Sequence, residues 1–467
     1  MRFKFRPRTR VRRNSYEINM TEGPILKKLV QFSVPLALSG ILQLLFNAAD
    51  IVVVGRFAGS HSLAAVGSTG ALNNLIVNLF IGLSIGVNVL VARYYGAGQG
   101  KDLYETVHTA ILTAAICGVA LIFLGIGLSR PLLEMMDTPA DVIDHSVLYM
   151  RIIFAGMPAG MIYNFGAAVL RAVGDTQRPL YFLLIAGVIN VVLNLFFVIV
   201  LHMGVAGVAT ATVISQCVSA VLVVLCLMRS EGVYRLNLKE LKIHKSKLIE
   251  MTRIGIPAGI QGSMFSISNV LIQSTINSFG AIAMAGSTAG GNIEGFVWTA
   301  MDAFTQATQS FVGQNYGAKK MDRVRKIMWS CMGLVTGVGL VLGVSAYLAA
   351  RPLLGIYSSD PAVIEYGRAR MLLVCVPYFT CGAMGIFVGG MRGLGSSLTP
   401  MINTVFSVCV LRVVWVYTVF ALWSTWEVLF LSYPVTWVVA SVIGGICYMV
   451  IKKKAVARLT PQGARSQ

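Results

Sequence analysis

The sequence predicts an all-α integral membrane protein with twelve transmembrane helices, arranged as two six-helix parallel repeats around a central cleft. Three observations lead to this fold class. Long apolar blocks dominate the chain, Lys and Arg gather in alternate connections, and short motifs recur at a nearly constant offset. The two repeats should be related by a pseudo-two-fold axis along the membrane normal.

Composition gives the first argument. Of the 467 residues, 56% are hydrophobic and only 12% are charged, and the mean hydropathy is +0.74. A soluble domain normally carries about 25% charged residues. The apolar blocks of this chain are long enough to cross a bilayer as helices, which satisfy their backbone hydrogen bonds internally. The eight cysteines form no CxxC pair, so neither a zinc site nor a disulfide framework is expected.

The apolar blocks predict twelve spans joined by short connections, except for one polar stretch in the middle of the chain. The predicted spans are residues 25–54, 61–94, 104–129, 142–171, 179–201, 204–229, 246–278, 282–315, 322–349, 361–393, 399–422 and 425–451. The predicted domains are a basic cytoplasmic extension (1–24), an N-lobe of helices 1–6 (25–229), a cytoplasmic linker (230–245), a C-lobe of helices 7–12 (246–452) and a basic cytoplasmic tail (453–467). Pro35, Pro158, Pro257 and Pro377 fall inside spans and should kink their helices.

Positive charge orients this arrangement. If the N-terminus is cytoplasmic, the inward segments hold 31 of the 38 Lys and Arg residues, as the positive-inside rule requires. We therefore expect a multi-pass protein of the bacterial cytoplasmic membrane with both termini in the cytoplasm. The net charge of +19 is then explained by attraction to an anionic leaflet, and no nucleic-acid partner is expected. A DNA-binding arm at residues 1–13 is the minor alternative.

The second half of the chain repeats the first. Tyr95-Gly96-Ala97 matches Tyr316-Gly317-Ala318, and Arg171-x-x-Gly174 matches Arg392-x-x-Gly395, both at an offset of 221. Six helices return the chain to its starting side, so the halves should run parallel. Two lobes around a cleft suit alternating access by rocking, and hence a transport function.

Polar residues inside the spans mark a candidate site in the N-lobe. Gln43, Asn47 and Asp50 share one face of the first helix. A carboxylate inside the bilayer costs at least a few kcal/mol, so a functional role is expected. Removal from water favours the protonated carboxyl, which suits an ion or proton site. The alternatives are a helix-packing hydrogen bond or a buried ion pair.

Other spans carry further candidates. Asn190 and Asn194 share a face of the fifth helix, and Thr212 lies in the sixth. Near Asp50 they would form an oxygen-rich site for a proton relay or Na⁺. In the eighth helix, Glu294 or Asp302 could bind a cationic substrate or pair with Arg412. The full set of expected cavity residues is Gln43, Asn47, Asn74, Gln261, Asn269, Glu294, Asp302 and Gln306.

Other features of the chain argue for structural roles or against enzymes. Arg171 and Arg392 end helices at the cytoplasmic side, where snorkelling is the simplest role. The sequence contains no Walker A motif, no HExxH and no paired aspartates for Mg²⁺. We therefore expect neither an enzyme nor a cofactor other than a coupling ion.

Several motifs together resemble the multidrug and toxic compound extrusion (MATE) family. These are Asn47–Gly55 (NAADIVVVG), Leu170–Thr176 (LRAVGDT), Asn292–Glu294 (NIE) and Phe311–Ala318 (FVGQNYGA). The resemblance implies a cation-coupled antiporter, in which H⁺ or Na⁺ enters as an organic, often cationic or amphipathic, compound such as a drug, dye or toxin leaves. Small organic substrates and the lipid bilayer are then its partners, and we expect a monomer.

The resemblance also implies which residues couple ion and substrate. Asp50, Asn190, Asn194 and Thr212 match the family's N-lobe site, where Na⁺ is the possible metal. The acids that the NorM-type branch carries in the seventh and tenth helices are absent, so the chain looks closer to the DinF-like branch. With Asn194 neutral, the site favours H⁺ over Na⁺.

Two alternatives remain. A lipid-linked precursor flippase of the same superfamily should have a more cationic cavity, whereas the buried charge here looks mostly acidic. An integral membrane transferase is disfavoured by the missing metal-binding acids.

Overall fold

The computed structural model describes residues 16–136 and 138–459. Within the second helix it leaves out the side chains at 60, 61, 63, 64, 68, 71, 72, 74 and 75. The described residues form helices and no strand, so the predicted fold class is confirmed. Each predicted span corresponds to one helical segment, which is straight, bent or interrupted by a π-helical turn.

The N-lobe contains seven α-helices and two π-helical turns. Their bounds are α1 Ile25–Val53, η1 Val54–Ala58, α2 Ser60–Ala97, α3 Gly100–Met135, α4 Ile143–Ala155, α5 Met157–Val173, α6 Gln177–Leu195, η2 Phe196–Val200 and α7 Gly204–Met228. The short 3₁₀ helix η3, Leu238–Glu240, lies in the linker.

The C-lobe repeats this order with more interruptions near its end. Its elements are α8 Lys245–Asn277, α9 Ala281–Gly317, α10 Met321–Leu348, α11 Ala350–Gly355, α12 Pro361–Val374, α13 Tyr378–Gly393, α14 Leu398–Thr404, η4 Val405–Val410, α15 Leu411–Trp415, η5 Val416–Phe420 and α16 Trp426–Leu459.

Most of these segments qualify as membrane spans. Among the described residues, eight segments are long and apolar enough to cross a bilayer, or ten if each of two bent pairs counts as one span. The remaining long helices, α8 and α9, have 33 and 37 residues but are less apolar. Both lie between the lobes, where polar side chains find partners. The count of twelve spans stays a prediction.

The two bent spans occupy equivalent places in the repeats. α4 and α5 meet at 47° and α12 and α13 at 44°, next to Pro158 and Pro377 respectively. The kinks predicted at these two prolines are therefore confirmed. Pro35 and Pro257 lie within the uninterrupted helices α1 and α8.

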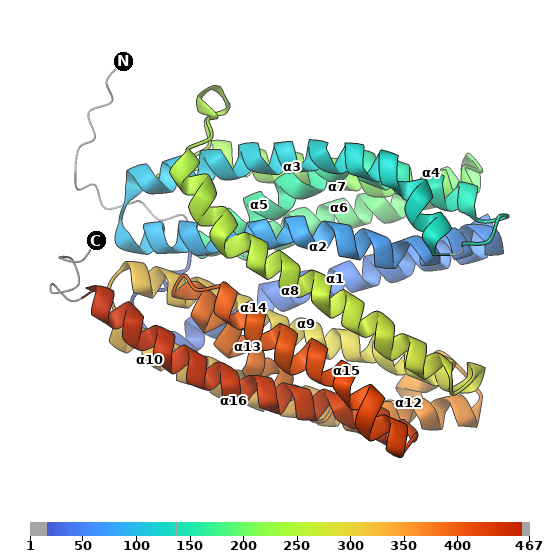
Figure 1. The fold of residues 1–467 in the computed structure, drawn as a ribbon. Coiled ribbons are helices and arrows are strands. Elements are labelled where there is room, and N and C mark those ends of the chain that lie inside the picture. The colour runs from blue at the N-terminus through green and yellow to red at the C-terminus, as the bar shows by residue number, and fades with distance from the viewer. Residues whose placement is uncertain (1–15, 137, 460–467) are drawn as a thin grey trace.

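The two lobes lie side by side with their helices roughly parallel (Figure 1). The described chain begins and ends at the same end of the bundle, which we call the termini end; the opposite end is the far end. α1 and α8 both start at the termini end, as parallel repeats require. α8 starts beside the N-lobe and crosses to the C-lobe.

The lobes meet backbone to backbone in the half of the bundle nearest the termini end. A Cβ atom on Gly86 of α2 would overlap the carbonyl oxygen of Met251 in α8. A Cβ on Gly96 would overlap the carbonyl oxygen of Gln314 in α9. Only glycine permits this approach. We call this contact between α2 and α8–α9 the glycine seam.

The seam does not extend to the far end. The inter-lobe hydrogen bond nearest the far end, among those between described residues, joins Asn78 Nδ2 and Ser266 Oγ at 3.4 Å. Beyond it, a Cβ atom added to Gly67 or Gly70 of α2 would have no described atom within 4 Å. The lobes are thus closed at the termini end and part toward the far end.

A large side chain in the glycine seam should destabilise this closed arrangement. Gly96→Leu cannot fit without moving α9, and overpacking typically costs about 1–3 kcal/mol. We expect the apparent melting temperature of the purified protein to fall by several degrees. Gly337→Leu is the matched control, because Gly337 lies in α10 and a Cβ there would meet nothing within 4 Å. Equal melting temperatures of the two variants would contradict the seam.

Residues 16–24 form an ordered segment, the N-terminal strap, whereas residues 1–15 of the predicted extension lie outside the described part. On the N-lobe, the Ile18 amide donates to the Gly174 carbonyl at 3.1 Å. The Glu17 carboxylate accepts bonds from Tyr95, at 3.0 Å, and from Tyr234 of the linker. Burial and the charge of Glu17 raise the pKa of Tyr234, so its hydroxyl stays a donor.

The strap is also bound to the C-lobe. Arg323 of α10 donates to the carbonyl oxygens of Met20, at 3.1 Å, and Gly23, at 2.9 Å. Asn315 donates to Met20 O at 3.1 Å. The Met20 side chain is fully buried. The strap therefore spans both lobes at the termini end.

Candidate functional site

The structure brings together the four residues proposed for ion coupling. Asn194 of α6 donates through Nδ2 to Asp50 Oδ1 of α1, and to Asn190 Oδ1 at 3.3 Å. Asn190 Nδ2 in turn lies 3.3 Å from Thr212 Oγ1 of α7. Asn190 and Asn194 are 5% and 0% exposed. The four side chains form one hydrogen-bonded chain across three helices.

Two π-helical turns lie directly beside this chain. η1 starts four residues after Asp50, and η2 starts two residues after Asn194. Extra residues in such turns re-aim neighbouring side chains, and π-bulges are frequent at functional sites. The apolar cluster of Val53, Val54, Val198 and Val208 packs the two turns together. Helical periodicity alone gives no signal for these turns, so the sequence did not reveal them.

Asp50 is not paired with a base in the part of the chain that the structure describes. Among the described residues it forms no ion pair, and its partner in hydrogen bonding is the neutral Asn194. The oxygen of that amide, Asn194 Oδ1, is buried without a hydrogen-bond partner in the described structure. Asp50 is therefore a partly buried carboxyl whose described polar partner is a neutral amide.

The other expected cavity residues of the N-lobe flank this chain. Gln43 and Asn47, on the same face of α1 as Asp50, are exposed. Asn74 lies in α2, but its side chain is outside the described part of the structure. The polar face of α1 is thus accessible beside the partly buried carboxyl.

In the C-lobe, Asp302 of α9 lies in a different environment. Gln306 donates to its carboxylate at 2.7 Å. The positive charges of Arg392 and Arg171 both act on it. These arginines occupy equivalent positions in the two repeats, one at the end of α13 and the other at the end of α5. Asp302 thus lies in the field of arginines from both lobes, without an ion pair to either among the described residues.

The snorkelling predicted for Arg392 is wrong. Arg392 is only 8% exposed, and its guanidinium donates to Gln261 Oε1 at 2.9 Å. Gln261, one of the expected cavity residues, is itself buried and also reaches Thr404 Oγ1 at 3.3 Å. Its amide is therefore occupied within the C-lobe. Asn269, by contrast, is exposed on α8.

Glu294 pairs with Arg370 rather than with Arg412. The Arg370 Nη2 to Glu294 Oε2 distance is 2.7 Å, and both side chains are 13% exposed. Arg370 also donates to Ser287 Oγ at 2.6 Å. The predicted pairing fails because Arg412 lies elsewhere, 4.1 Å from the ring centre of Tyr433.

The balance of buried charge differs from the expectation. Arg392 and Arg412 are buried, and Arg370 and Arg171 are partly so. The acids away from the helix termini at the membrane surface are Asp50, Glu294 and Asp302. Arg412 is 2% exposed and forms no ion pair among the described residues. The interior is therefore not mostly acidic, because Arg370, Arg392 and Arg412 lie inside the C-lobe.

Two helical lobes, closed at one end and carrying ionisable side chains inside their spans, define a membrane transport protein. The chain belongs to the MatE family, which it matches over residues 35–196 and 257–418, once in each repeat. This double match also confirms the internal duplication.

Individual relatives extend over almost the whole chain. It is 27% identical over 445 residues to "Probable multidrug resistance protein YoeA" of Bacillus subtilis (strain 168), covering 93% of this chain and 96% of that one. It is 24% identical to "FAD transporter" of Shewanella oneidensis, covering 84% and 86%. The structure titled "Outward-facing conformation of a multidrug resistance MATE family transporter of the MOP superfamily" shares the fold, with a TM-score of 0.88, 20% identity and coverage of 95% and 99%.

Proposed function

We propose that this protein is a secondary active antiporter that exports organic, cationic or amphipathic compounds in exchange for H⁺. The observation that carries the proposal is Asp50, a partly buried carboxyl with no cation beside it among the described residues, held by Asn194 in a polar chain of three helices. The name of the YoeA relative supports drugs as the substrate class. No enzymatic activity and no cofactor other than the coupling ion are part of this proposal.

The chain of polar groups suggests how a proton would be held. Burial favours the neutral carboxyl, whereas the Asn194 N–H donor favours the carboxylate. The two effects oppose each other at one atom, so protonation and release can both occur in a cycle. At the other end of this series of hydrogen bonds, Asn190 and Thr212 fix the orientation of the Asn194 amide. Opening of the glycine seam would then expose the cleft to the other side of the membrane.

A proton fits this arrangement better than Na⁺. The site offers a single carboxylate, and Asn194 presents its N–H group to it rather than an oxygen. Sodium prefers a cage of oxygens. Asn190 Oδ1, Thr212 Oγ1 and the unpaired Asn194 Oδ1 are the groups that could join Asp50 in such a cage.

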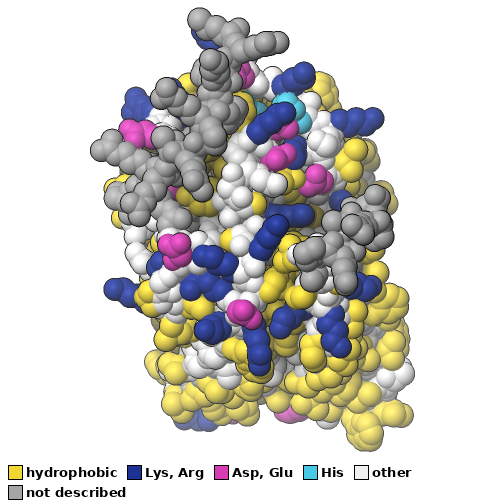
Figure 2. Space-filling model, turned by 90° about the vertical axis from the view of Figure 1, so that its left-hand side faces the viewer, with side chains coloured by type: hydrophobic (Ala, Val, Ile, Leu, Met, Phe, Trp, Pro, Cys, Tyr) yellow, Lys and Arg dark blue, Asp and Glu magenta, His cyan; other side chains and the backbone are white. Residues whose placement is uncertain are grey.

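We place the protein in the bacterial cytoplasmic membrane as a monomer, with the termini end in the cytoplasm. Lys and Arg side chains are spread over that end, and few Asp and Glu lie among them (Figure 2). Cytoplasmic surfaces are enriched in this way. Because the lobes are closed at the termini end, the cleft between them would then be accessible from outside the cell. The acids that the NorM-type branch carries in its seventh and tenth helices are absent from the corresponding α8 and α13, and this favours a place near the DinF-like branch.

A second candidate is the transport of anionic compounds, including lipid-linked precursors. It is favoured by the uncompensated Arg412 and by the arginines around Asp302. The Shewanella relative named as an FAD transporter points to the same class of substrate.

Reconstituted vesicles would separate these functions. We expect an imposed pH gradient at constant Na⁺ to drive efflux of a cationic dye. A Na⁺ gradient at constant pH should drive no efflux. Efflux that follows Na⁺ alone would overturn proton coupling. Transport of a labelled dinucleotide or lipid-linked sugar that cationic dyes leave unaffected would favour the second candidate.

A further inference from the structure

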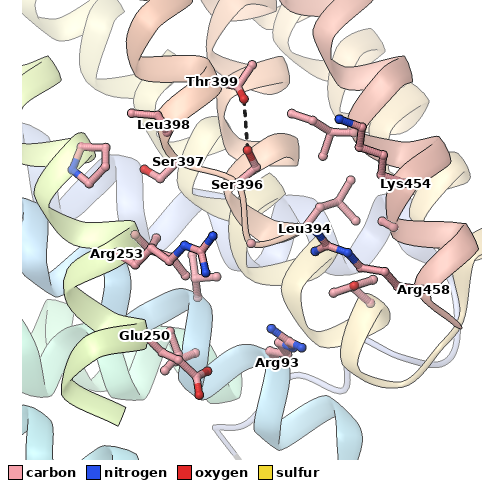
Figure 3. Close-up of a pocket in the computed structure, with 18 of the residues that line it drawn as sticks. Arg93, Glu250, Arg253, Leu394, Ser396, Ser397, Leu398, Thr399, Lys454 and Arg458 are labelled. Carbon is pink, nitrogen blue, oxygen red and sulfur yellow. Dashed lines mark hydrogen bonds between the residues drawn. The ribbon is translucent and has the colours of Figure 1, made fainter. Parts of the chain in front are cut away.

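A large pocket opens at the termini end, away from the polar chain around Asp50. Its volume is about 1500 Å³. Its walls are the end of α2, the start of α8, the end of α16 and the loop before α14 (Figure 3). The pocket therefore lies at the join of the two lobes, where the helices leave the membrane.

Four cations line this pocket. Arg93 comes from α2, Arg253 from α8, and Lys454 and Arg458 from one face of α16. Figure 3 shows the Arg253 and Arg458 guanidinium groups directed toward the middle of the pocket from opposite walls, with Arg93 below them. None of the four has an ion pair with any residue that the structure describes. The Arg93 guanidinium also lies 5.5 Å from the ring centre of Tyr316.

The acids in the wall do not neutralise these cations. Asp102 pairs with Lys247 at 2.6 Å, outside the set of four. Glu250 accepts a hydrogen bond from the Tyr94 hydroxyl at 2.8 Å. With Asp102 paired elsewhere, four cations face one remaining carboxylate. The pocket therefore carries a surplus of positive charge that an anion would compensate.

Hydroxyl groups complete the polar wall. Ser396 donates to Thr399 at 3.3 Å. The neighbouring Ser397 is only 3% exposed, and its Oγ has no hydrogen-bond partner in the described structure. Buried hydroxyls are normally satisfied. An unpaired donor beside unpaired guanidinium groups is the combination that phosphate oxygens satisfy.

The rest of the pocket is apolar and continues along the membrane surface. Ile256 and Leu398 belong to its wall and are 45% and 56% exposed. On α8 the exposed apolar face continues through Ile260, and on α14 it continues through Ile402 and then to Phe406 of η4. α8 and α14 contact each other, so the two faces are adjacent. A ligand with an anionic head and apolar chains matches this surface in both parts.

We propose that this pocket binds the phosphate headgroup of an anionic phospholipid from the leaflet at the termini end. Arg93, Arg253, Arg458 and Lys454 hold the phosphate, and the acyl chains lie along α8 and α14. Basic pockets of this kind between transmembrane helices bind anionic lipid headgroups. Because Arg93 belongs to α2 and the other cations to the C-lobe, the bound lipid joins the two lobes and stabilises the closed termini end.

Native mass spectrometry of the purified full-length chain tests the site. With phosphatidylglycerol we expect one bound lipid per chain at low lipid concentration, and no such adduct with phosphatidylcholine of the same chains. The variant Arg253→Gln/Arg458→Gln should bind phosphatidylglycerol roughly 30-fold more weakly, at about one kcal/mol for each charge near the headgroup. Lys453→Gln is the matched control, because Lys453 is exposed on α16 outside the pocket.

Equal binding of the two lipids by the wild-type chain, or an undiminished adduct in the double variant, would overturn the proposal. Inorganic phosphate and glycerol 3-phosphate distinguish the source of the phosphate. Displacement of the adduct by either at millimolar concentration would show a site for a soluble anion instead of a lipid. Lipid binding is measured without transport, so the result is independent of the proposed antiport.

Discussion

Replacing Asp50 by asparagine is expected to abolish export driven by a pH gradient while leaving the protein folded. The variant keeps the shape of the side chain and a hydrogen-bonding partner for Asn194, but it removes the one group of the polar chain that can bind and release a proton. Dye efflux from vesicles should fall to the level of vesicles without protein. Binding of the dye, measured by fluorescence anisotropy, should persist.

Glu427→Gln is the control for this experiment. Glu427 is an exposed carboxylate in the first turn of α16, far along the chain from the polar residues of the N-lobe. The same loss of one negative charge there should leave efflux unchanged. If Asp50→Asn still concentrates dye against a gradient, with normal insertion and melting temperature, Asp50 is not the coupling residue.

Neutralising Glu294 is expected to destabilise the C-lobe strongly. Glu294→Gln leaves Arg370 buried without its carboxylate, and breaking one side of a buried pair costs about 3–5 kcal/mol. We expect a large fall in the melting temperature and in the yield of folded protein. The measurement is thermal unfolding of purified protein, followed by tryptophan fluorescence.

The double variant Glu294→Gln/Arg370→Met separates a structural pair from a substrate site. Removing both charges should restore much of the stability, because no unpaired charge stays buried. A substrate-binding acid would behave differently: Glu294→Gln would then melt like the wild type and lose only affinity for cationic dyes. That outcome would contradict the ion-pair role.

The N-lobe site could be located from sequence because its residues obey helical spacing. Asn190 and Asn194 are one turn apart, and the family resemblance linked them with Asp50 and Thr212. The structure joins all four through hydrogen bonds. Their role in ion coupling stays a prediction.

Partners across the C-lobe could not be located in this way. The sequence suggested Arg412 as a partner of Glu294, and only the packing of the helices shows that Arg370 reaches it instead. Arg392 lies at a helix end, where the bilayer boundary is nearby, so a position near water was expected. Its burial depends on Gln261 from another helix.

The close contact of the lobes along the glycine seam could not be predicted from sequence either, although its glycines belong to the repeated motifs. Gly96 and Gly317 were recognised as matching positions, but a motif does not say which surface a glycine faces. In the structure both lie so close to backbone of the other lobe that an added Cβ would overlap a carbonyl oxygen. Long-range contact, rather than local turn geometry, explains these glycines.

The N-terminal strap has a practical consequence for experiments on living cells. Because its carbonyl groups accept hydrogen bonds from Arg323 and Asn315 while Glu17 is held by the other lobe, a bulky fusion joined close to Tyr16 would press on the contact between the lobes. Reporter proteins belong at the opposite terminus, after the last helix. A small fluorophore at the strap, by contrast, would report each opening of the two lobes directly.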